Sequence, residues 1–278
     1  MTKHIQQIAI VGCGWLGTPL AFHLKGLGFD VRGSRQHVSA RLDLTQAKIA
    51  NTALSLTPEL VCDDAPLLFE GCDLLIINIP PRRKSHDSAY HIAQIDALKQ
   101  AAIDYQIPRV LFVSSTSVYG PNQGVVDEST PLEPVSESGK TLAAIEHDLQ
   151  MSPLKSCILR FGGLIGAGRH PGRFLSGRVV AGADAPVNLI HQKDCIGIIQ
   201  AIIEQDLFNG SYNAVCDAHP CKQEFYEAAA KALSLELPQF SQTSAGNKLI
   251  SNQALKQALG YCFIYPDPIA WITQQESQ

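Results

Sequence analysis

The 278-residue sequence lacks the features that mark several specialised classes of protein. Its eight cysteines form no CxxC pair and stand at no His/Cys ligand spacing, which excludes a recognisable zinc site or disulfide framework. Lysine and arginine form no long run and the net charge is −4, which excludes a basic surface for nucleic acid or an anionic membrane. No apolar stretch approaches the ~20 residues of a membrane span. These absences predict a soluble cytoplasmic protein with reduced cysteines.

The composition that remains is that of a globular enzyme. Apolar residues make up 45% and charged residues 17% of the chain, which can therefore bury a sizeable core. Apolar strands alternate with helical patterns as far as residue 161, and several strands are almost continuously apolar. Such strands are typical of a parallel sheet covered on both faces. We expect an α/β fold with a nucleotide-binding domain over 1–160 and a small lobe over 161–278, packed on the same sheet across a soft boundary.

The expected elements follow from hydrophobic periodicity and from glycine and proline stops. No linker, repeat or low-complexity tract interrupts them. Strands are expected at 7–11, 29–35, 52–57, 72–79, 109–115, 156–161 and 211–215, and helices at 16–27, 37–51, 88–107, 137–150, 194–205 and 221–235.

A glycine-rich turn follows the first strand. In "IAIVGCGWLG" the glycines at 12, 14 and 17 stand in the GxGxxG spacing, between a strand and a helix. The first glycine makes the tight turn, the second lets the backbone approach a pyrophosphate, and the third lets the helix pack closely on the strand. The helix N-terminus favours the anion. The motif predicts dinucleotide binding; the alternative is a tight turn without a ligand.

The end of the second strand bears on which dinucleotide is bound. An acidic residue there would hold the ribose 2′-hydroxyl of NAD, but the sequence reads Arg32-Gly33-Ser34-Arg35. Arginine suits a 2′-phosphate, so NADP is preferred over NAD, unless both arginines are only solvated. At the adenine end, Asp43 is too close to Arg35 to follow a third strand, so Ser55 takes that position and backbone groups would recognise adenine.

Four separated motifs resemble those of the extended short-chain dehydrogenase/reductases of the NAD-dependent epimerase/dehydratase type. They are the glycine-rich turn, "VLFVSSTSVYG", "ILRFGGLIGAGR" and "VNLIHQKD" with His191 and Asp194. The stretches "INIPP", "GRHPGRF" and "YPDP" are most similar to the YeeZ-like branch. The resemblance implies a Rossmann-type doubly wound sheet with a substrate lobe. It also implies a nicotinamide cofactor, and hydride transfer at a carbon of a sugar or another small carbonyl compound.

The resemblance also implies a strand-end Ser or Thr and a Tyr-x-x-x-Lys pair on the next helix. The hydroxyl falls on Ser115, beside Thr116 and Ser117. In "PVSESGKTLAAIEH", however, the tyrosine position is Ser138 and the lysine position is Leu142. Lys140 lies two residues along the helix, about 200° away, and cannot substitute. "ESGKT" is not a phosphate loop, so these residues are expected to start a helix with Ser136 or Ser138 as its N-cap.

Other side chains remain open to more than one interpretation. Tyr119 carries the phenol nearest the strand end and is either a weak candidate proton donor or a packing residue. Arg169, His170 and Arg173 either bind an anionic substrate or belong to a lid. His191 is expected to be structural rather than catalytic.

Two functions are therefore compared: an oxidoreductase or epimerase-like enzyme with a degenerate active site, and an NADP-binding sensor or regulatory protein that has lost turnover. A homodimer is a further expected assembly. The expected cofactor residues are Gly12, Gly14, Trp15, Leu16, Gly17, Ser34, Arg35, Pro80 and Pro81; the expected catalytic residues are Ser115, Thr116 and Tyr119; no metal ligands are expected.

Overall fold

The computed structural model describes residues 4–37, 41–57, 59–81 and 88–275. The chain forms two compact units, each assembled from three stretches: 1–115, 136–159 and 199–211 in the first, and 116–135, 160–198 and 212–278 in the second. One crossing between the two units lies at 159/160. Two further stretches, 116–135 and 199–211, belong to a different unit from their neighbours in sequence.

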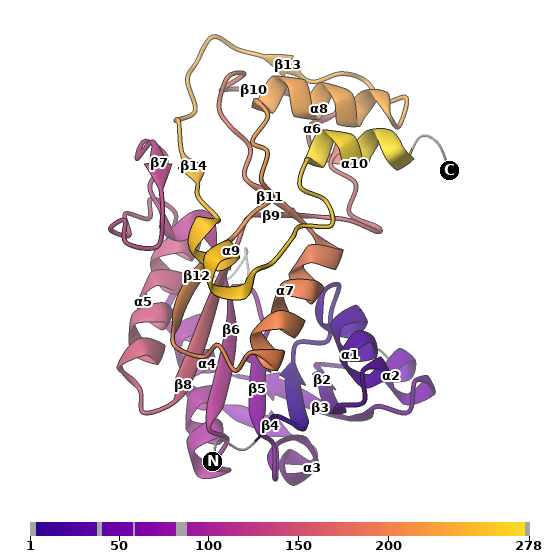
Figure 1. Cartoon of the computed structure of the whole chain (residues 1–278), viewed down its shortest axis with the longest axis vertical. Helices are drawn as coiled ribbons and strands as arrows, with labels where there is room; N and C mark the ends of the chain where they lie inside the picture. The colour runs from indigo at the N-terminus through magenta and orange to yellow at the C-terminus, as the bar shows by residue number, and fades with distance from the viewer. Residues whose placement is uncertain (1–3, 38–40, 58, 82–87, 276–278) are drawn as a thin grey trace. The chain divides into compact units, whose positions relative to one another are not determined.

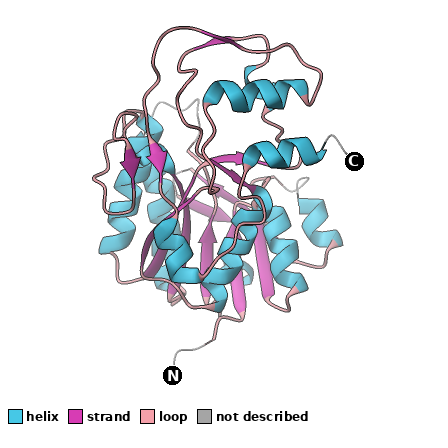
Figure 2. Ribbon diagram, turned by 45° about the horizontal axis from the view of Figure 1, so that its top comes forward, coloured by secondary structure: helices cyan, strands magenta, loops and turns pink. Residues whose placement is uncertain are grey.

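An eight-stranded sheet with helices on its faces dominates the first unit (Figures 1 and 2). Its order is β12-β8-β6-β5-β1-β2-β3-β4. β1 pairs in parallel with β2 and β5, β2 with β3, and β5 with β6, whereas β4 is antiparallel to β3. The strands are β1 (Gln7–Val11), β2 (Asp30–Arg35), β3 (Ala50–Leu56), β4 (Leu60–Cys62), β5 (Leu74–Ile77), β6 (Arg109–Ser115), β8 (Lys155–Phe161) and β12 (Gly210–Ala214).

The apolar runs explain this sheet. All four residues of β5 are buried, as are the first four of β6, so these strands are covered on both faces, as a central parallel strand requires. The helices are α1 (Gly17–Gly26), α2 (Leu42–Gln46), α3 (Ala65–Phe69), α4 (Ser88–Asp104) and α5 (Glu137–Met151), with α4 packed against α5. The predicted α/β fold with a doubly wound, mainly parallel sheet is confirmed.

The second unit is built from short elements around a separate apolar cluster. It contains the 3-10 turn η2 (Thr116–Val118) and the parallel pairs β7 (Val125–Val126) with β14 (Leu249–Ile250), β9 (Gly163–Ile165) with β11 (Leu189–His191), and β10 (Val179–Val180) with β13 (Gln239–Phe240). Its helices are α6 (Gly172–Leu175), α8 (Lys222–Lys231), α9 (Gln253–Leu259) and α10 (Pro268–Gln275), while α7 (Gln192–Glu204) begins here and continues into the first unit. Ile165, Leu189, Phe225, Trp271 and Ile272 belong to the cluster.

Within the described residues, no helix is long and apolar enough to cross a membrane, and no group of three His, Cys, Asp or Glu side chains could hold a metal ion. All eight cysteines are free. Burial raises the pKa of the thiols of Cys13, Cys157 and Cys216 to about 12, so they are unreactive near neutral pH.

Candidate functional site

The glycine-rich turn has the backbone that the GxGxxG motif predicts. Gly12 has a φ of +101°, which a residue with a side chain rarely adopts. A Cβ at Gly12 would collide with the carbonyl oxygen of Asn78, and one at Gly17 would collide with the carbonyl oxygen of Gly12. A Cβ at Gly14 would meet nothing within 4 Å. Two of the glycines are thus required by packing, whereas Gly14 leaves an open space at the start of α1.

A cavity of about 270 Å³ lies beside this turn, in the first unit. β1, β2 and β3 end at it, as does the chain that leaves β5, so it occupies the carboxyl edge of the parallel strands, where α/β sheets bind ligands. The described residues that line it are Val11, Gly12, Ser34, Arg35, Gln36, Leu54, Ser55, Leu56, Ile79, Pro80 and Gln94. Of the predicted cofactor residues, Gly12, Ser34, Arg35 and Pro80 belong to this lining; Gly14, Trp15, Leu16, Gly17 and Pro81 do not.

Arg35 is the main charged group at this cavity. Its Nη2 donates to Oγ1 of Thr18 at 2.6 Å and lies 3.3 Å from Oδ2 of Asp43. Its Nε is buried and has no hydrogen-bond partner among the described residues. The guanidinium is therefore only partly satisfied, and Asp43, rejected as an adenine ligand on sequence grounds, is its carboxylate partner. The guanidinium has five N–H donors, and its contacts with Thr18 and Asp43 use only two of them, so an anion in the cavity could engage a donor that remains.

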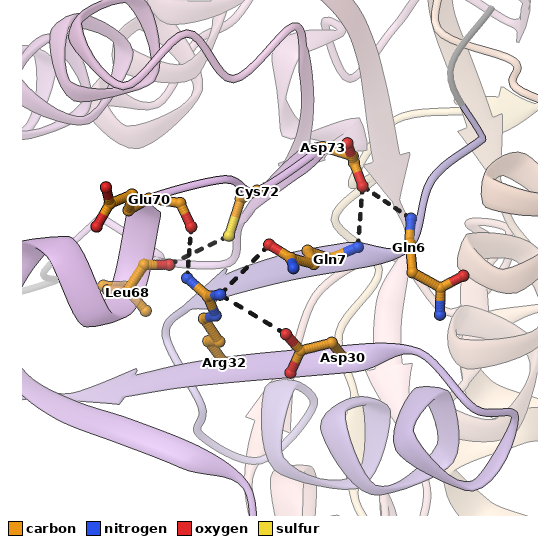
Figure 3. Close-up of polar contacts among 8 residues, drawn as sticks. All are labelled: Gln6, Gln7, Asp30, Arg32, Leu68, Glu70, Cys72 and Asp73. Atoms are coloured by element: carbon orange, nitrogen blue, oxygen red, sulfur yellow. Dashed lines mark hydrogen bonds and ion pairs between the residues drawn. The ribbon is translucent and has the colours of Figure 1, made fainter.

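The second arginine of this strand is placed differently, so Arg32 does not support 2′-phosphate binding. Residues three apart on a strand point to opposite faces. Nη1 of Arg32 donates to the carbonyl of Glu70 at 2.6 Å, and Nη2 donates to Oε1 of Gln7 at 3.3 Å and lies 3.6 Å from Asp30 (Figure 3). Arg32 thus lines a different hollow, in which neither Arg35 nor the glycine-rich turn takes part.

Two residues that the sequence did not single out organise the cavity. Asn78 follows β5, and its Nδ2 donates to the carbonyl of Gly12 at 3.0 Å, which fixes the glycine-rich turn. Gln94 of α4 is 95% buried, and its Nε2 donates to the carbonyl of Leu56 at 2.7 Å, which holds the end of β3. The position of Asn78 directly after an apolar strand was a usable signal. Nothing local marks Gln94.

The strand-end hydroxyls lie where the motif predicts them. Ser115 is the last residue of β6, and Thr116 opens η2. On α5, Ser136 is the N-cap and accepts a hydrogen bond from the backbone N–H of Gly139 at 3.1 Å. Ser138 is exposed, and Leu142 is 4% exposed. At this helix start, neither aligned position offers a phenol or an ammonium group.

Lys140 is a surface residue of the helix start. Its ammonium pairs with Oε1 of Glu137 at 2.8 Å, one turn back on the exposed face of α5. Such a surface pair contributes little to stability and indicates no role in a site.

Tyr119 is held on several sides within the second unit. It is 1% exposed, and its hydroxyl accepts from Nη1 of Arg160 at 2.6 Å. Its single proton is donated to the carbonyl of Asp127 or to Oδ1 of Asn213, 2.9 and 3.0 Å away. Burial raises the pKa of this phenol despite the nearby arginine. These contacts favour packing over proton donation as the role of Tyr119.

The predicted anion-binding loop precedes and enters α6. Arg169 forms a β-bridge with Gly166, and Nδ1 of His170 accepts from the backbone N–H of Gly172 at 3.2 Å. Burial, aided by the charge of Arg173, lowers the pKa of His170. Arg173 is exposed and forms no ion pair with any residue in the described ranges, so it is not paired with a surface carboxylate there. Its role in substrate binding stays a prediction.

His191 and Asp194 both hold the C-terminal part of the second unit. The His191 ring lies 4.1 Å from that of Tyr265 and 5.0 Å from that of Trp271, measured between centroids. Asp194, fully buried, accepts from the backbone N–H groups of Ile264 at 2.6 Å and Tyr265 at 3.1 Å, and from the hydroxyl of Tyr261 at 3.1 Å. This geometry favours the structural interpretation of the "VNLIHQKD" motif.

Comparison with known proteins agrees with the sequence motifs and the fold. The family model described as the NAD dependent epimerase/dehydratase family matches residues 77–195. The protein YeeZ of Escherichia coli K12 is 39% identical over 269 residues, which cover 95% of this chain and 98% of YeeZ.

Solved structures share the fold at lower identity. A UDP-N-acetylglucosamine 4-epimerase from Bacillus cereus superposes with a TM-score of 0.78 at 15% identity, covering 98% of this chain and 100% of that one. A short-chain dehydrogenase/reductase superfamily protein from Agrobacterium tumefaciens, described with bound NAD, has a TM-score of 0.76 at 18% identity, covering 98% of each chain. With its glycine-rich turn, its parallel sheet and a relative of 39% identity over nearly its whole length, the chain belongs to the NAD-dependent epimerase/dehydratase family.

Proposed function

We propose that this protein binds NADP(H) in the cavity beside the glycine-rich turn and acts as an oxidoreductase or epimerase on a small carbonyl compound, sugar or nucleotide sugar. The observation that carries the proposal is the partly satisfied Arg35 guanidinium in a cavity that the GxGxxG turn borders. The similarity to an epimerase and to a protein described with bound NAD supports the same class of cofactor and substrate.

The residues present fit a dinucleotide. The open space at Gly14 leaves room for a pyrophosphate against the N-terminus of α1. Leu54, Leu56, Ile79 and Pro80 provide apolar surface for an adenine ring, and Ser55 stands where an acidic residue would otherwise bind its amine. Arg35 would hold a 2′-phosphate. The bound nicotinamide would supply or accept the hydride.

Replacing Arg35 by alanine tests the cofactor preference. A charge-assisted hydrogen bond contributes about 1.5–3 kcal/mol, so we expect Arg35→Ala to bind NADPH about 10- to 100-fold more weakly and NADH with unchanged affinity. Asp43→Asn should strengthen NADPH binding, because it frees Arg35 and removes a negative charge next to the phosphate. Isothermal titration calorimetry with both cofactors measures these changes.

Arg32→Ala is the matched control, since Arg32 lies on the same strand but is bound to Glu70 and Gln7. It should leave the affinities for both cofactors unchanged. Equal loss of NADPH and NADH affinity in Arg35→Ala would contradict a 2′-phosphate contact, and failure of the wild type to bind either cofactor would refute the proposal.

Turnover would depend on the strand-end hydroxyls. Ser115 stands at the family's hydroxyl position, and Thr116 follows it at the start of η2. We therefore assign to the Ser115 hydroxyl, with Thr116 beside it, a hydrogen bond to the reacting oxygen of the substrate. The proton donor is another group than Ser138. If NADPH oxidation is screened over carbonyl compounds and nucleotide sugars, Ser115→Ala should lower turnover of any active substrate by about 100-fold, the lower end of acid–base contributions.

The alternative is a sensor that binds the cofactor without turnover. The observation that favours it is the start of α5, where Ser138 and Leu142 replace the expected acid and its helper. NADPH binding without oxidation on any substrate of the screen, with Ser115→Ala indistinguishable from the wild type, would select this alternative.

A further inference from the structure

Lys248 lies in the second unit and contacts the turn that follows the strand-end hydroxyls. Its Nζ donates to the carbonyl of Thr116 at 3.0 Å and to the carbonyl of Tyr119, also at 3.0 Å. The same Thr116 carbonyl accepts the long 3.3 Å bond from the N–H of Tyr119 that closes η2. The backbone hydrogen bond of the turn is therefore weak, and the ammonium of Lys248 links the carbonyls at both ends of the turn.

The backbone around Lys248 is fixed independently of this contact. β14 pairs in parallel with β7, so that 247–251 run along 121–126 through N–H bonds of Asn247 to Pro121, Leu249 to Gly124 and Ser251 to Val126. Gly246 has a φ of +93°, and a Cβ there would collide with the carbonyl of Pro121.

The side chain of Asn188 completes this arrangement. Its Nδ2 donates to the carbonyl of Lys248 at 2.9 Å, and its Oδ1 accepts from the N–H of Ile250 at 2.8 Å. The backbone that carries Lys248 is thus fixed by hydrogen bonds on both sides, and this places its side chain at the turn.

The charge of Lys248 is not needed for packing. It forms no ion pair with any acidic side chain in the part of the chain described, and its two partners are neutral carbonyls. Burial lowers the pKa of this half-buried ammonium, since the charged form is partly desolvated. An apolar side chain would fill the same space without that cost, so the role of the ammonium lies in its two hydrogen bonds to the turn.

We propose that Lys248 is a positioning residue for the strand-end turn: its ammonium holds Thr116–Tyr119 in one conformation, and with it the hydroxyls of Thr116 and Ser117 next to Ser115. This ammonium comes from the segment between β13 and α9, whereas α5 has Leu142 at the family's lysine position. The catalytic meaning of this arrangement rests on the proposed function, whereas the contact itself does not.

Hydrogen–deuterium exchange of the cofactor-free protein tests the proposal. In Lys248→Met, peptides covering 115–121 should exchange about tenfold faster or more, because two hydrogen bonds from a charged donor, each worth about 1.5–3 kcal/mol, are lost. Lys248→Arg keeps the charge and the donors and should restore most of the protection. Peptides of α1, in the other unit, should exchange as in the wild type.

Lys222→Met is the matched control, because the Lys222 ammonium also donates to a carbonyl, that of Ala181, at 3.1 Å in the same unit. It should leave the exchange of 115–121 unchanged. Unchanged exchange in Lys248→Met would overturn the proposal, as would faster exchange throughout the chain that Lys248→Arg does not correct. On any substrate found in the screen, Lys248→Met should lower kcat and leave the KM for NADPH unchanged.

The two proposals fail separately. The exchange measurement is made without cofactor, so absence of NADPH binding would refute the proposed function and leave the role of Lys248 standing. Conversely, normal cofactor binding with unaltered exchange in Lys248→Met would refute only the positioning role.

Discussion

Gly17→Ala is expected to destabilise the first unit strongly, whereas Gly14→Ala is expected to fold as the wild type does and to bind the cofactor more weakly. A methyl group at Gly17 would overlap the carbonyl oxygen of Gly12 and lie 3.1 Å from Nδ2 of Asn78. Both neighbours are fixed, Gly12 by its positive φ and Asn78 by its hydrogen bonds to the turn and to Val11. We expect the free energy of unfolding to fall by about 3 kcal/mol or more, since overpacking here displaces backbone.

Gly14→Ala separates the requirements of the ligand from those of the fold. Nothing lies within 4 Å of its added methyl, so the free energy of unfolding should change by less than about 0.5 kcal/mol. The methyl would, however, occupy the space that a pyrophosphate needs to approach the backbone. We expect NADPH affinity to fall by at least about tenfold, or 1.4 kcal/mol.

Urea denaturation followed by circular dichroism, together with calorimetric titration, measures both properties on the same preparations. Normal NADPH binding by Gly14→Ala would show that the pyrophosphate does not lie against this turn. Normal stability of Gly17→Ala would show that α1 can move away from the turn, contrary to the close packing described.

The central strands of the sheet were predictable because burial on both faces leaves a nearly continuous apolar run, whereas the three-residue strand β4 was not predicted. "LLII" is the whole of β5, and "VLFV" lies within β6. The helix expected over 37–51 was wrong in its length: α2 covers only Leu42–Gln46, and residues 38–40 lie outside the described residues. Its apolar spacing continues past Gln46, but Lys48 adopts a φ of +55° and the chain turns directly into β3.

The site was predictable where one short segment builds it and not where distant segments meet. The glycine-rich turn and Arg35 follow from local spacing. Asn78, Gln94 and Lys248 carry no local signal of comparable strength, because their roles depend on contacts with carbonyls at least 38 residues away in sequence. The pairing of β7 with β14, which delivers Lys248, joins two-residue strands that no periodicity identifies.

His191 is expected to make the protein markedly less stable in mild acid. It is 5% exposed, and its Nδ1 accepts from the backbone N–H of Lys193 at 3.1 Å, so the neutral ring carries its proton on Nε2. Burial, aided by the charge of Lys193, lowers the pKa of His191 from 6.5 to about 4. Well above pH 6.5 the ring is neutral in both the folded and the unfolded state, so His191 does not make the free energy of unfolding depend on pH.

Between pH 6.5 and pH 4 the unfolded chain binds a proton at His191 that the folded protein does not. The free energy of unfolding therefore decreases as the pH falls through this range. The loss reaches about 3 kcal/mol at pH 4, and it levels off below that pH once the folded protein is protonated as well. His191→Asn removes the titrating group and keeps an acceptor for the N–H of Lys193. It should be less stable at pH 7, because it loses the ring contacts with Tyr265 and Trp271, but its stability should fall less steeply toward pH 4.

Part of the acid dependence should remain in His191→Asn, because burial also lowers the pKa values of His91, His170 and His219. Urea denaturation at half-unit intervals from pH 7 to pH 4 measures the difference in slope. His147→Asn is the control, since His147 is exposed on α5 and its replacement should leave the slope unchanged. Equal slopes for the wild type and His191→Asn would mean that His191 titrates alike in both states, and so that its ring is open to water.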